Sequence, residues 1–203
     1  MIIAGAGGHA LEVLDILTHH QISSIAVYGE EISPFWPSQH TSYTQLDQVG
    51  MWLAQSPEFV LGVGSPTHRK KLFQAFSQRG GVLQPLRGPQ AIISPSAKSQ
   101  GADVLSGAFV GAHVQLGLGV LVNTGAQIHH EVRVGDFSVI NPGAVLLGAC
   151  QIGSECFIGA QATILPGVRI GDRVTIGAGA VIIRDVPPGV TVVGVPGRIL
   201  PRP

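Results

Sequence analysis

Residues 152–176 read IGSECFIGAQATILPGVRIGDRVTI, and in this stretch every sixth residue is an isoleucine. The same spacing of branched aliphatic residues runs without a break from Val104 to Ile182. Its fourteen members are Val104, Val110, Leu116, Val122, Ile128, Val134, Ile140, Leu146, Ile152, Ile158, Ile164, Ile170, Ile176 and Ile182. A period of six that lasts this long is typical of a parallel β-helix.

Two other positions of the repeat support this interpretation. The residue after the aliphatic is often glycine, and the fourth residue after it is small or β-branched, as at Ala108 and Val114. Short strands need inward aliphatic residues, and tight corners need small residues or glycine with positive φ. Cys150 and Cys156 occupy the small position, so we expect them to be apolar filler in a reducing compartment.

The N-terminal stretch MIIAGAGGHALEVLDIL (residues 1–17) has a short apolar segment, then the pattern G-x-G-x-x-A from Gly5 to Ala10. Leu11, Leu14 and Leu17 follow with the spacing of one helix face. At a strand-to-helix turn, such a glycine pattern favours a phosphate bound by backbone N–H groups. The alternative is a glycine turn that only packs the helix on the strand.

Two further apolar segments continue this half. Residues 25–28 are followed by Gly29 and Glu30, about where an acidic side chain contacts a ribose. EFVLGVG (58–64) precedes SPTHRKKLFQAF (65–76), which we interpret as a capped helix. Alternating strands and helices predict a parallel α/β unit. Its length, below about 90 residues, suits half of a dinucleotide fold and hence a mononucleotide-type ligand.

The predicted organisation is therefore a Rossmann-like nucleotide-binding domain over residues 1–84 and a β-helix with a C-terminal tail over residues 101–203. The Pro-rich segment LQPLRGPQAIISPSA (83–97) marks the connection, assigned to residues 85–100.

The composition excludes several classes of function. The 203 residues carry 12 Lys and Arg and 12 Asp and Glu, which gives no footprint for nucleic acid. No run of 18 apolar residues occurs, so we expect no membrane span. Strand-like residues begin at Met1, which leaves no room for a signal peptide and predicts a cytoplasmic protein. No zinc-type Cys and His spacing is present, so we expect no metal.

The segment IHHEV (128–132) is the polar exception within the repeat. Ile128 is in register with the inward aliphatic residues, so His129, His130 and Glu131 are expected on an exposed ledge. A neutral imidazole can remove a proton near pH 7, and an adjacent carboxylate can orient the ring and stabilise its cation.

Four segments together resemble one family. They are GAGGHA (5–10), IISPSA (92–97), VNTGAQIHHEVRVGDF (122–137) and VVGVPGRIL (192–200). They are similar to the NeuD and PglD type of hexapeptide-repeat sugar O- and N-acetyltransferases of bacterial surface-glycan synthesis. The resemblance implies a left-handed β-helix with three hexads per coil. It also implies transfer from acetyl-CoA to a nucleotide-linked 4-amino sugar, by a homotrimer with active sites between subunits.

The resemblance also implies roles for individual residues. His130 is the general base and Glu131 the carboxylate that raises its basicity. Substrate contacts are implied for Gly7, Gly8, His9, Gly29, Glu30, Gly64, Thr67, Arg69 and Asn123. Of these, Gly29 and Glu30 stand where the family has two aspartates.

For acetyl-CoA the resemblance implies backbone contacts along the β-helix. Residues Ala160 and Ala178 are 18 apart and are expected to stack as a ladder. Val139 stands where the family has a histidine that contacts CoA. The complete implied set is Val139, Gly148, Ala160, Ala178, Gly194, Pro196 and Arg198, with Arg198 as a phosphate partner.

Other interpretations stay open at this point. The acceptor could be a hydroxyl, as in sialic acid O-acetylation, and the chain could be a trimeric scaffold without activity. A metal-dependent hydratase resembling γ-class carbonic anhydrases needs three convergent histidines, and His113, His129 and His130 lack that spacing. We expect His129 and His113 to be surface or interface residues. The sugar, its nucleotide and the acetylated atom are not specified by the sequence.

Overall fold

A computed structural model of the chain describes residues 1–201. It divides into two compact units, the first spanning Met1–Leu86 and the second beginning at Arg87. Across the described residues, no helix is both long enough and apolar enough to cross a membrane.

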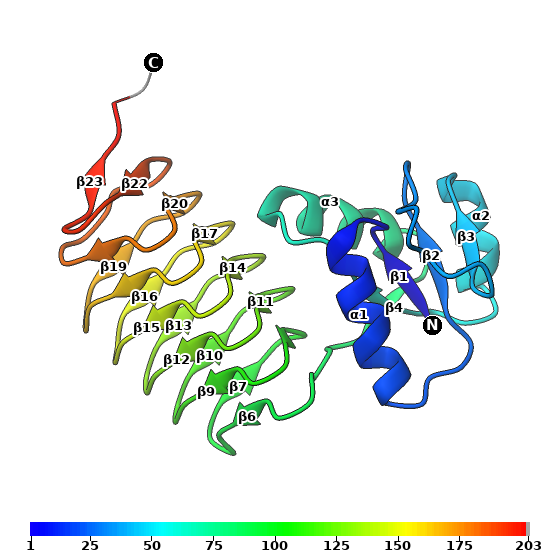
Figure 1. Ribbon diagram of the computed structural model, residues 1–203, viewed down its shortest axis with the longest axis horizontal. Helices are drawn as coiled ribbons and strands as arrows, with labels where there is room; N and C mark the ends of the chain where they lie inside the picture. The colour runs from blue at the N-terminus through cyan, green and yellow to red at the C-terminus, as the bar shows by residue number, and fades with distance from the viewer. Residues whose placement is uncertain (202–203) are drawn as a thin grey trace. The chain divides into compact units, whose positions relative to one another are not determined.

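The first unit alternates strands with helices (Figure 1). Its elements are β1 (Ile2–Ala4), α1 (Gly8–His19), β2 (Ala26–Tyr28), β3 (Thr41–Tyr43), α2 (Leu46–Leu53), β4 (Glu58–Leu61), α3 (Pro66–Ser77) and β5 (Val82–Leu83). The five strands form one parallel sheet in the order β3-β2-β1-β4-β5. The predicted parallel α/β unit is confirmed.

Helices cover both faces of this sheet. Helices α2 and α3 pack on the face that carries Ile2 and Phe59, whereas α1 lies on the face of Ile3, next to Ala10 and Gly62. Chain order reverses between β1 and β4. In open parallel sheets, ligands bind beyond the carboxyl ends of the strands at this point.

Three details differ from expectation. Ser65 is the N-cap residue of α3, but its side chain makes no capping hydrogen bond. Leu11 is only half-buried, because the buried face of α1 is formed by Ala10, Val13, Leu14, Ile16 and Leu17. Strand β3 and helix α2 were not predicted, although Leu46, Val49 and Leu53 have the spacing of one helix face.

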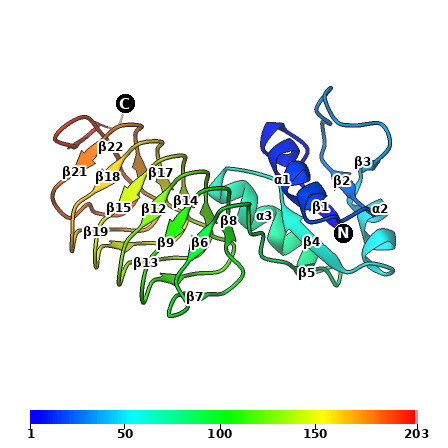
Figure 2. The same cartoon turned by 60° about the horizontal axis from the view of Figure 1, so that its bottom comes forward.

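The second unit is a stack of coils built from short strands (Figures 1 and 2). Its strands are β6 (Ile92–Ile93), β7 (Lys98–Ser99), β8 (Asp103–Val104), β9 (Phe109–Val110), β10 (Gln115–Leu116), β11 (Leu121–Val122), β12 (Gln127–Ile128), β13 (Arg133–Val134), β14 (Val139–Ile140), β15 (Val145–Leu146), β16 (Gln151–Ile152), β17 (Phe157–Ile158), β18 (Thr163–Ile164), β19 (Arg169–Ile170), β20 (Thr175–Ile176), β21 (Val181–Ile182), β22 (Thr191–Val193) and β23 (Arg198–Ile199). Strands β6 and β7, within the segment expected to be a connection, already pair with β9 and β10.

The strands form three faces. The first face has the order β6-β9-β12-β15-β18-β21, the second β7-β10-β13-β16-β19, and the third β8-β11-β14-β17-β20-β22-β23. From β8 to β21, successive strands of a face are parallel and 18 residues apart in register, as Ile128 with Leu146 and Leu146 with Ile164. The spacing is 17 residues for β6 and β7 with their partners and 16 for β20 with β22, and β23 is antiparallel to β22. The expected parallel β-helix with three hexads per coil is confirmed.

The fourteen repeated aliphatic residues form the core of this unit. Their exposed fractions lie between 0% and 4%. The small residues four positions further on, from Ala108 to Ala180, are buried as well. The only polar member of that series, Ser138, donates its hydroxyl to Gly153 O (2.7 Å) and accepts from Cys156 N (2.9 Å). The core therefore contains no unsatisfied hydroxyl at this position.

Both cysteines are buried and free. Burial raises the pKa of Cys150 to about 12 and also raises the pKa of Cys156. A thiol that stays protonated is a poor nucleophile. The expectation that they are filler agrees with this burial.

The corners of the coils show how glycine is used. Positive φ recurs at every sixth position from Gly107 to Gly179, three residues after each aliphatic, and seven of these positions are not glycine. The glycines directly after the aliphatic residues do not have positive φ, contrary to expectation. They are needed for space: a Cβ on Gly135 would lie 2.6 Å from the carbonyl carbon of Gly153 and the N of Ser154 in the next coil.

We predict that Gly135→Ala destabilises the β-helix by about 1–3 kcal/mol through backbone overpacking. Gly125→Ala is the matched control, because its corner has positive φ but open space around the new Cβ. This control should lose only about 1 kcal/mol, the cost of the left-handed conformation. Thermal melting of both variants checks the order of the two effects. Equal melting temperatures would contradict the close-approach explanation.

Candidate active site

The corner between the first and second faces carries His130 and Glu131, and we call it the His130 edge. Both residues follow β12, and Glu131 has the positive φ (63°) of the corner position. His130 Nδ1 lies 3.0 Å from Glu131 Oε2. Both side chains are 64% exposed. The pair therefore stands on the surface, as expected from the register of Ile128, with its hydrogen bond intact.

The imidazole of His130 lies over Gly148 in the next coil. A Cβ added to Gly148 would collide with the ring, 2.6 Å from Nε2 and closer still to Cε1. The backbone joins the same coils, since Ala149 N donates to His130 O (2.9 Å). Glycine at residue 148 thus provides the space in which the ring lies, and Glu131 fixes the ring's orientation from the other side.

The other two histidines of this edge have different surroundings. His129 is half-buried, and its ring lies against Phe109 with centroids 5.8 Å apart. His113 has positive φ and donates its backbone N–H to Ser96 Oγ (3.0 Å). Within residues 1–201, no group of three or more His, Cys, Asp or Glu side chains is arranged to hold a metal ion.

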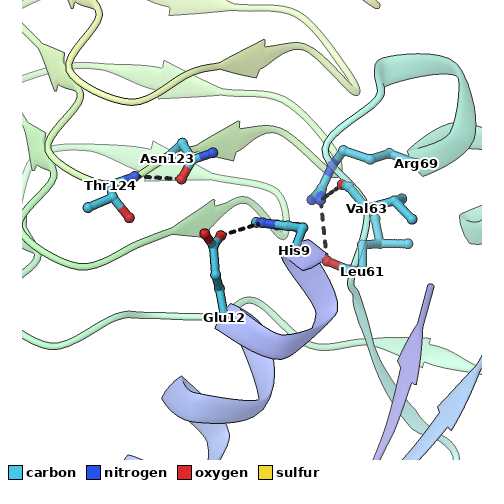
Figure 3. A network of polar contacts seen from close by, with 7 residues as sticks. All are labelled: His9, Glu12, Leu61, Val63, Arg69, Asn123 and Thr124. Carbon is cyan, nitrogen blue, oxygen red and sulfur yellow. Dashed lines mark hydrogen bonds and ion pairs between the residues drawn. The ribbon is translucent and has the colours of Figure 1, made fainter. Parts of the chain in front are cut away.

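The implied acetyl-CoA residues fall on two different edges. Gly148 belongs to the His130 edge. Ala160 and Ala178 lie between the third and first faces, on what we call the Ala160 edge, and they stack in adjacent coils. Asn123 lies on this second edge too, where its Oδ1 accepts from Thr124 N (2.7 Å), as Figure 3 shows. A strand of the first face separates the two edges in every coil.

The C-terminal turn closes the end of the Ala160 edge. Gly194 O accepts from Val181 N (3.1 Å), and Gly197 N donates to Val181 O (2.8 Å). Pro196 and Arg198 are exposed there. Val139 differs from the other implied residues because its side chain is fully buried.

A pocket of 470 Å³ opens in the first unit at the carboxyl ends of its strands. Gly29 and Glu30 line it, together with Gly5 and Ala6 of the glycine-rich turn. Gly5 and Gly29 must be glycine because side chains of neighbouring residues lie too close for a Cβ. A Cβ on Gly29 would lie 2.5 Å from the Ala6 Cβ, and Gly5, with a φ of 117°, would collide with Val63.

The N-terminal turn of α1 stands open beside this pocket's glycine turn. Gly7 and Gly8 are exposed, and no side chain caps the helix. His9 Nδ1 lies 2.9 Å from Glu12 Oε2 on the same helix (Figure 3). An uncapped helix start with no acidic residue in its first turn favours an anion.

The three implied substrate contacts after β4 differ in their exposure to solvent. Arg69 is fully buried, and its guanidinium donates to Val63 O (2.9 Å) and Leu61 O (3.4 Å), as Figure 3 shows. Arg69 therefore holds the end of β4 in place. Thr67 is exposed and Gly64 is half-buried. None of the three lines the pocket.

The pocket contains two residues that sequence reasoning missed, His68 and Lys71. They share one face of α3 with Leu72 and Ala75, which also line the pocket. This spacing was visible in the sequence, but nothing there showed which face of the helix meets the ligand. Tyr28 lines the pocket too. Burial, and then the carboxylate of Glu30, raise its pKa, so the hydroxyl remains a neutral donor.

A larger groove of 750 Å³ lies over the second face and is lined by Gln115, Arg133, Gln151 and Arg169, among others. It contains neither His130 nor Glu131. The largest groove described here and the residues implied by the resemblance therefore lie in different parts of the second unit.

Two family models match the sequence. The PglD N-terminal domain matches residues 1–76, and the bacterial transferase hexapeptide (six repeats) matches residues 149–184. No curated protein matches the chain.

Solved structures match nearly the whole chain. The acetyltransferase domain of PglB from Neisseria gonorrhoeae, in complex with acetyl coenzyme A, is 32% identical, with 98% of each chain covered and a TM-score of 0.88. PerB from Caulobacter crescentus, in complex with CoA and GDP-perosamine, is 29% identical, with 98% and 96% covered and a TM-score of 0.88. A histidine-to-asparagine mutant of perosamine N-acetyltransferase from that organism, with the same ligands, is 28% identical, with 99% and 96% covered and a TM-score of 0.90. The chain, a left-handed β-helix preceded by a PglD-type domain, therefore belongs to the NeuD and PglD family of hexapeptide-repeat sugar acetyltransferases.

Proposed function

We propose that the chain transfers an acetyl group from acetyl-CoA to the amino group of a nucleotide-linked 4-amino sugar, with His130 as general base. The observation that carries this proposal is the His130–Glu131 pair, held over Gly148 on an open edge of the β-helix. The same chain has a PglD-type domain, and the glycine-rich turn of that domain lines a pocket.

The geometry suits base catalysis. When Nδ1 carries the ring proton, it donates to Glu131, and the lone pair of Nε2 is free to accept a proton. Acetyl-CoA supplies the activated thioester carbonyl. As the sugar nitrogen bonds to that carbon, it becomes acidic, and His130 Nε2 takes its proton. Glu131 stabilises the imidazolium that results. The C–S bond then breaks, and the imidazolium gives its proton to the departing sulfur, which releases CoA as the thiol and restores the neutral base.

In this proposal the first unit binds the nucleotide. The open start of α1, with Gly7 and Gly8, offers backbone N–H groups to a diphosphate. Glu30, just after β2, and Lys71 on α3 line the pocket, together with the carboxylate of Glu31 and the imidazole of His68. We assign Lys71 to a phosphate and Glu30 to hydroxyl or N–H donors of the nucleoside.

We further propose a homotrimer with its active sites between subunits. The corner that carries His130 is convex, with the side chain 64% exposed, so one chain alone cannot enclose two substrates there. Asn123 and His130 belong to the same coil but to different edges. A neighbouring subunit at the same height would bring its Ala160 edge, including Asn123, opposite His130.

The proposed reaction serves bacterial surface-glycan synthesis in the cytoplasm, where acetyl-CoA and nucleotide sugars are both available. A direct test offers the purified protein acetyl-CoA with GDP-, UDP- and dTDP-linked 4-amino sugars, and with sialic acid as a hydroxyl acceptor. Thiol release and an N-acetylated product with one of the amino sugars are expected. Transfer to sialic acid alone would replace this proposal with O-acetylation.

Removing the base should stop the reaction without harming the protein. His130→Ala is expected to lower kcat about 10²–10⁴-fold, the usual contribution of a general base. The matched control is His129→Ala, because the adjacent ring packs on Phe109 and has no carboxylate partner within residues 1–201. It should keep kcat within about tenfold. Steady-state kinetics decide, and a similar loss in both variants would remove His130 as the base.

Gly148→Ala tests the position of the ring. The new methyl group occupies the space of the imidazole, so His130 must move and kcat should fall about 10²-fold. Gly50→Ala in α2 of the first unit is the control, because its new methyl group meets open space, so its kcat should stay near that of the parent. Full activity in Gly148→Ala would show that the observed ring position is not the reactive one.

A further inference from the structure

The His130 edge continues beyond His130 toward the C-terminal end of the β-helix. In the next two coils the positions above His130 are Gly148 and Pro166, because Ile128, Leu146 and Ile164 are in register. In the third coil Ile182 lies over Ile164, and Val186 pairs with Ile170. The turn between them is shortened to three residues, and its middle residue is Arg184.

Arg184 is an exposed cation on an edge where the residues between His130 and this turn are neutral, apart from Glu131 beside His130, and the turn itself also contains Asp185. Among residues 1–201, its guanidinium makes no hydrogen bond or ion pair. The adjacent carboxylate is already engaged, because Asp185 Oδ1 accepts from Arg169 N (2.8 Å). Arg184 is therefore available to an anionic ligand that runs along this edge.

The height of Arg184 above His130 can be compared with the length of CoA. Strands in a ladder are spaced about 4.8 Å apart, so three coils place Arg184 about 14 Å above His130. The CoA sulfur and its first phosphorus are joined by about 13 bonds. An extended chain advances roughly 1.15 Å per bond, which gives about 15 Å. A thioester at His130 thus brings the diphosphate level with Arg184.

The opposite direction along the edge does not fit. Toward the N-terminus, only the coils of Ala112 and Pro95 remain, as Val110 pairs with Ile128 and Ile93 with Val110. Two coils span about 10 Å, which is shorter than the pantetheine arm. Their corner residues include His113 but no lysine or arginine.

We propose that Arg184 binds the 5′-diphosphate of CoA and so fixes the direction in which the pantetheine arm lies along the His130 edge. A guanidinium suits this role because it pairs with phosphate oxygens through two parallel N–H groups. This inference rests on the proposed acetyl-CoA dependence of the enzyme. It adds a residue on the same edge as the base, whereas Arg198 stands at the end of the Ala160 edge.

Calorimetric titration of the assembled protein with CoA, without any sugar acceptor, tests the assignment. Arg184→Gln should raise the Kd for CoA at least about tenfold, as expected for the loss of a charge-assisted hydrogen bond. Arg173→Gln is the matched control, because Arg173 is exposed on the corner between the second and third faces. Its Kd should equal that of the parent. Equal Kd values for Arg184→Gln and the parent would overturn the proposal.

Titration with 3′-dephospho-CoA identifies the phosphate. If Arg184 binds the diphosphate, Arg184→Gln weakens CoA and 3′-dephospho-CoA by the same factor. If the loss is confined to CoA, Arg184 binds the 3′-phosphate instead and the diphosphate assignment is wrong. Failure of the parent protein to bind CoA would instead refute the proposed function, so the two failures are distinguishable.

Discussion

The second unit depends on one constraint, which is that from β8 to β21 each strand residue pairs with the residue 18 positions further along the chain. Backbone N–H groups of one coil donate to carbonyls of the next, as Asn123 N does to Ile140 O (2.8 Å) and Asn141 N to Ile158 O (2.9 Å). The coils between these strands have equal length, and the first and last coils of the unit are one or two residues shorter. A slip of one residue in the pairing of a strand would turn its buried aliphatic side chain outward.

The same constraint fixes the backbone conformation of an exposed corner of the β-helix. His130 and Glu131 are on a corner, yet the corner is bonded to the coils on both sides, through Glu131 N to Ala112 O (2.8 Å) and Ala149 N to His130 O (2.9 Å). The rigid backbone then places Gly148 of the next coil against the imidazole. A catalytic group on rigid elements keeps its geometry better than one on a free loop. The repeat thus fixes the backbone that carries the exposed His130 side chain.

Much of this could be predicted from the sequence, and the missing parts have physical reasons. The inward positions follow from the period, so the β-helix and the exposure of His130 were predictable. The corner conformation was not, because Glu131 and Phe137 have positive φ against their own preference. There the ladder overrides local propensity. The contact between the His130 ring and Gly148 could have been predicted, because Gly148 lies 18 residues, or one coil, after His130. His68 and Lys71 could not, since the helix pattern does not reveal which face meets a ligand.

The central claim is that His130 of one subunit works with the Ala160 edge of another. Co-expression of His130→Ala chains with Ala178→Arg chains, each with its own tag, allows mixed trimers to be isolated by tandem purification. Each mixed trimer then has one interface in which both edges are intact, so activity of about one third of the parent is expected although neither variant is active alone. Mixed trimers as inactive as the two variants would show that each site lies within a single chain.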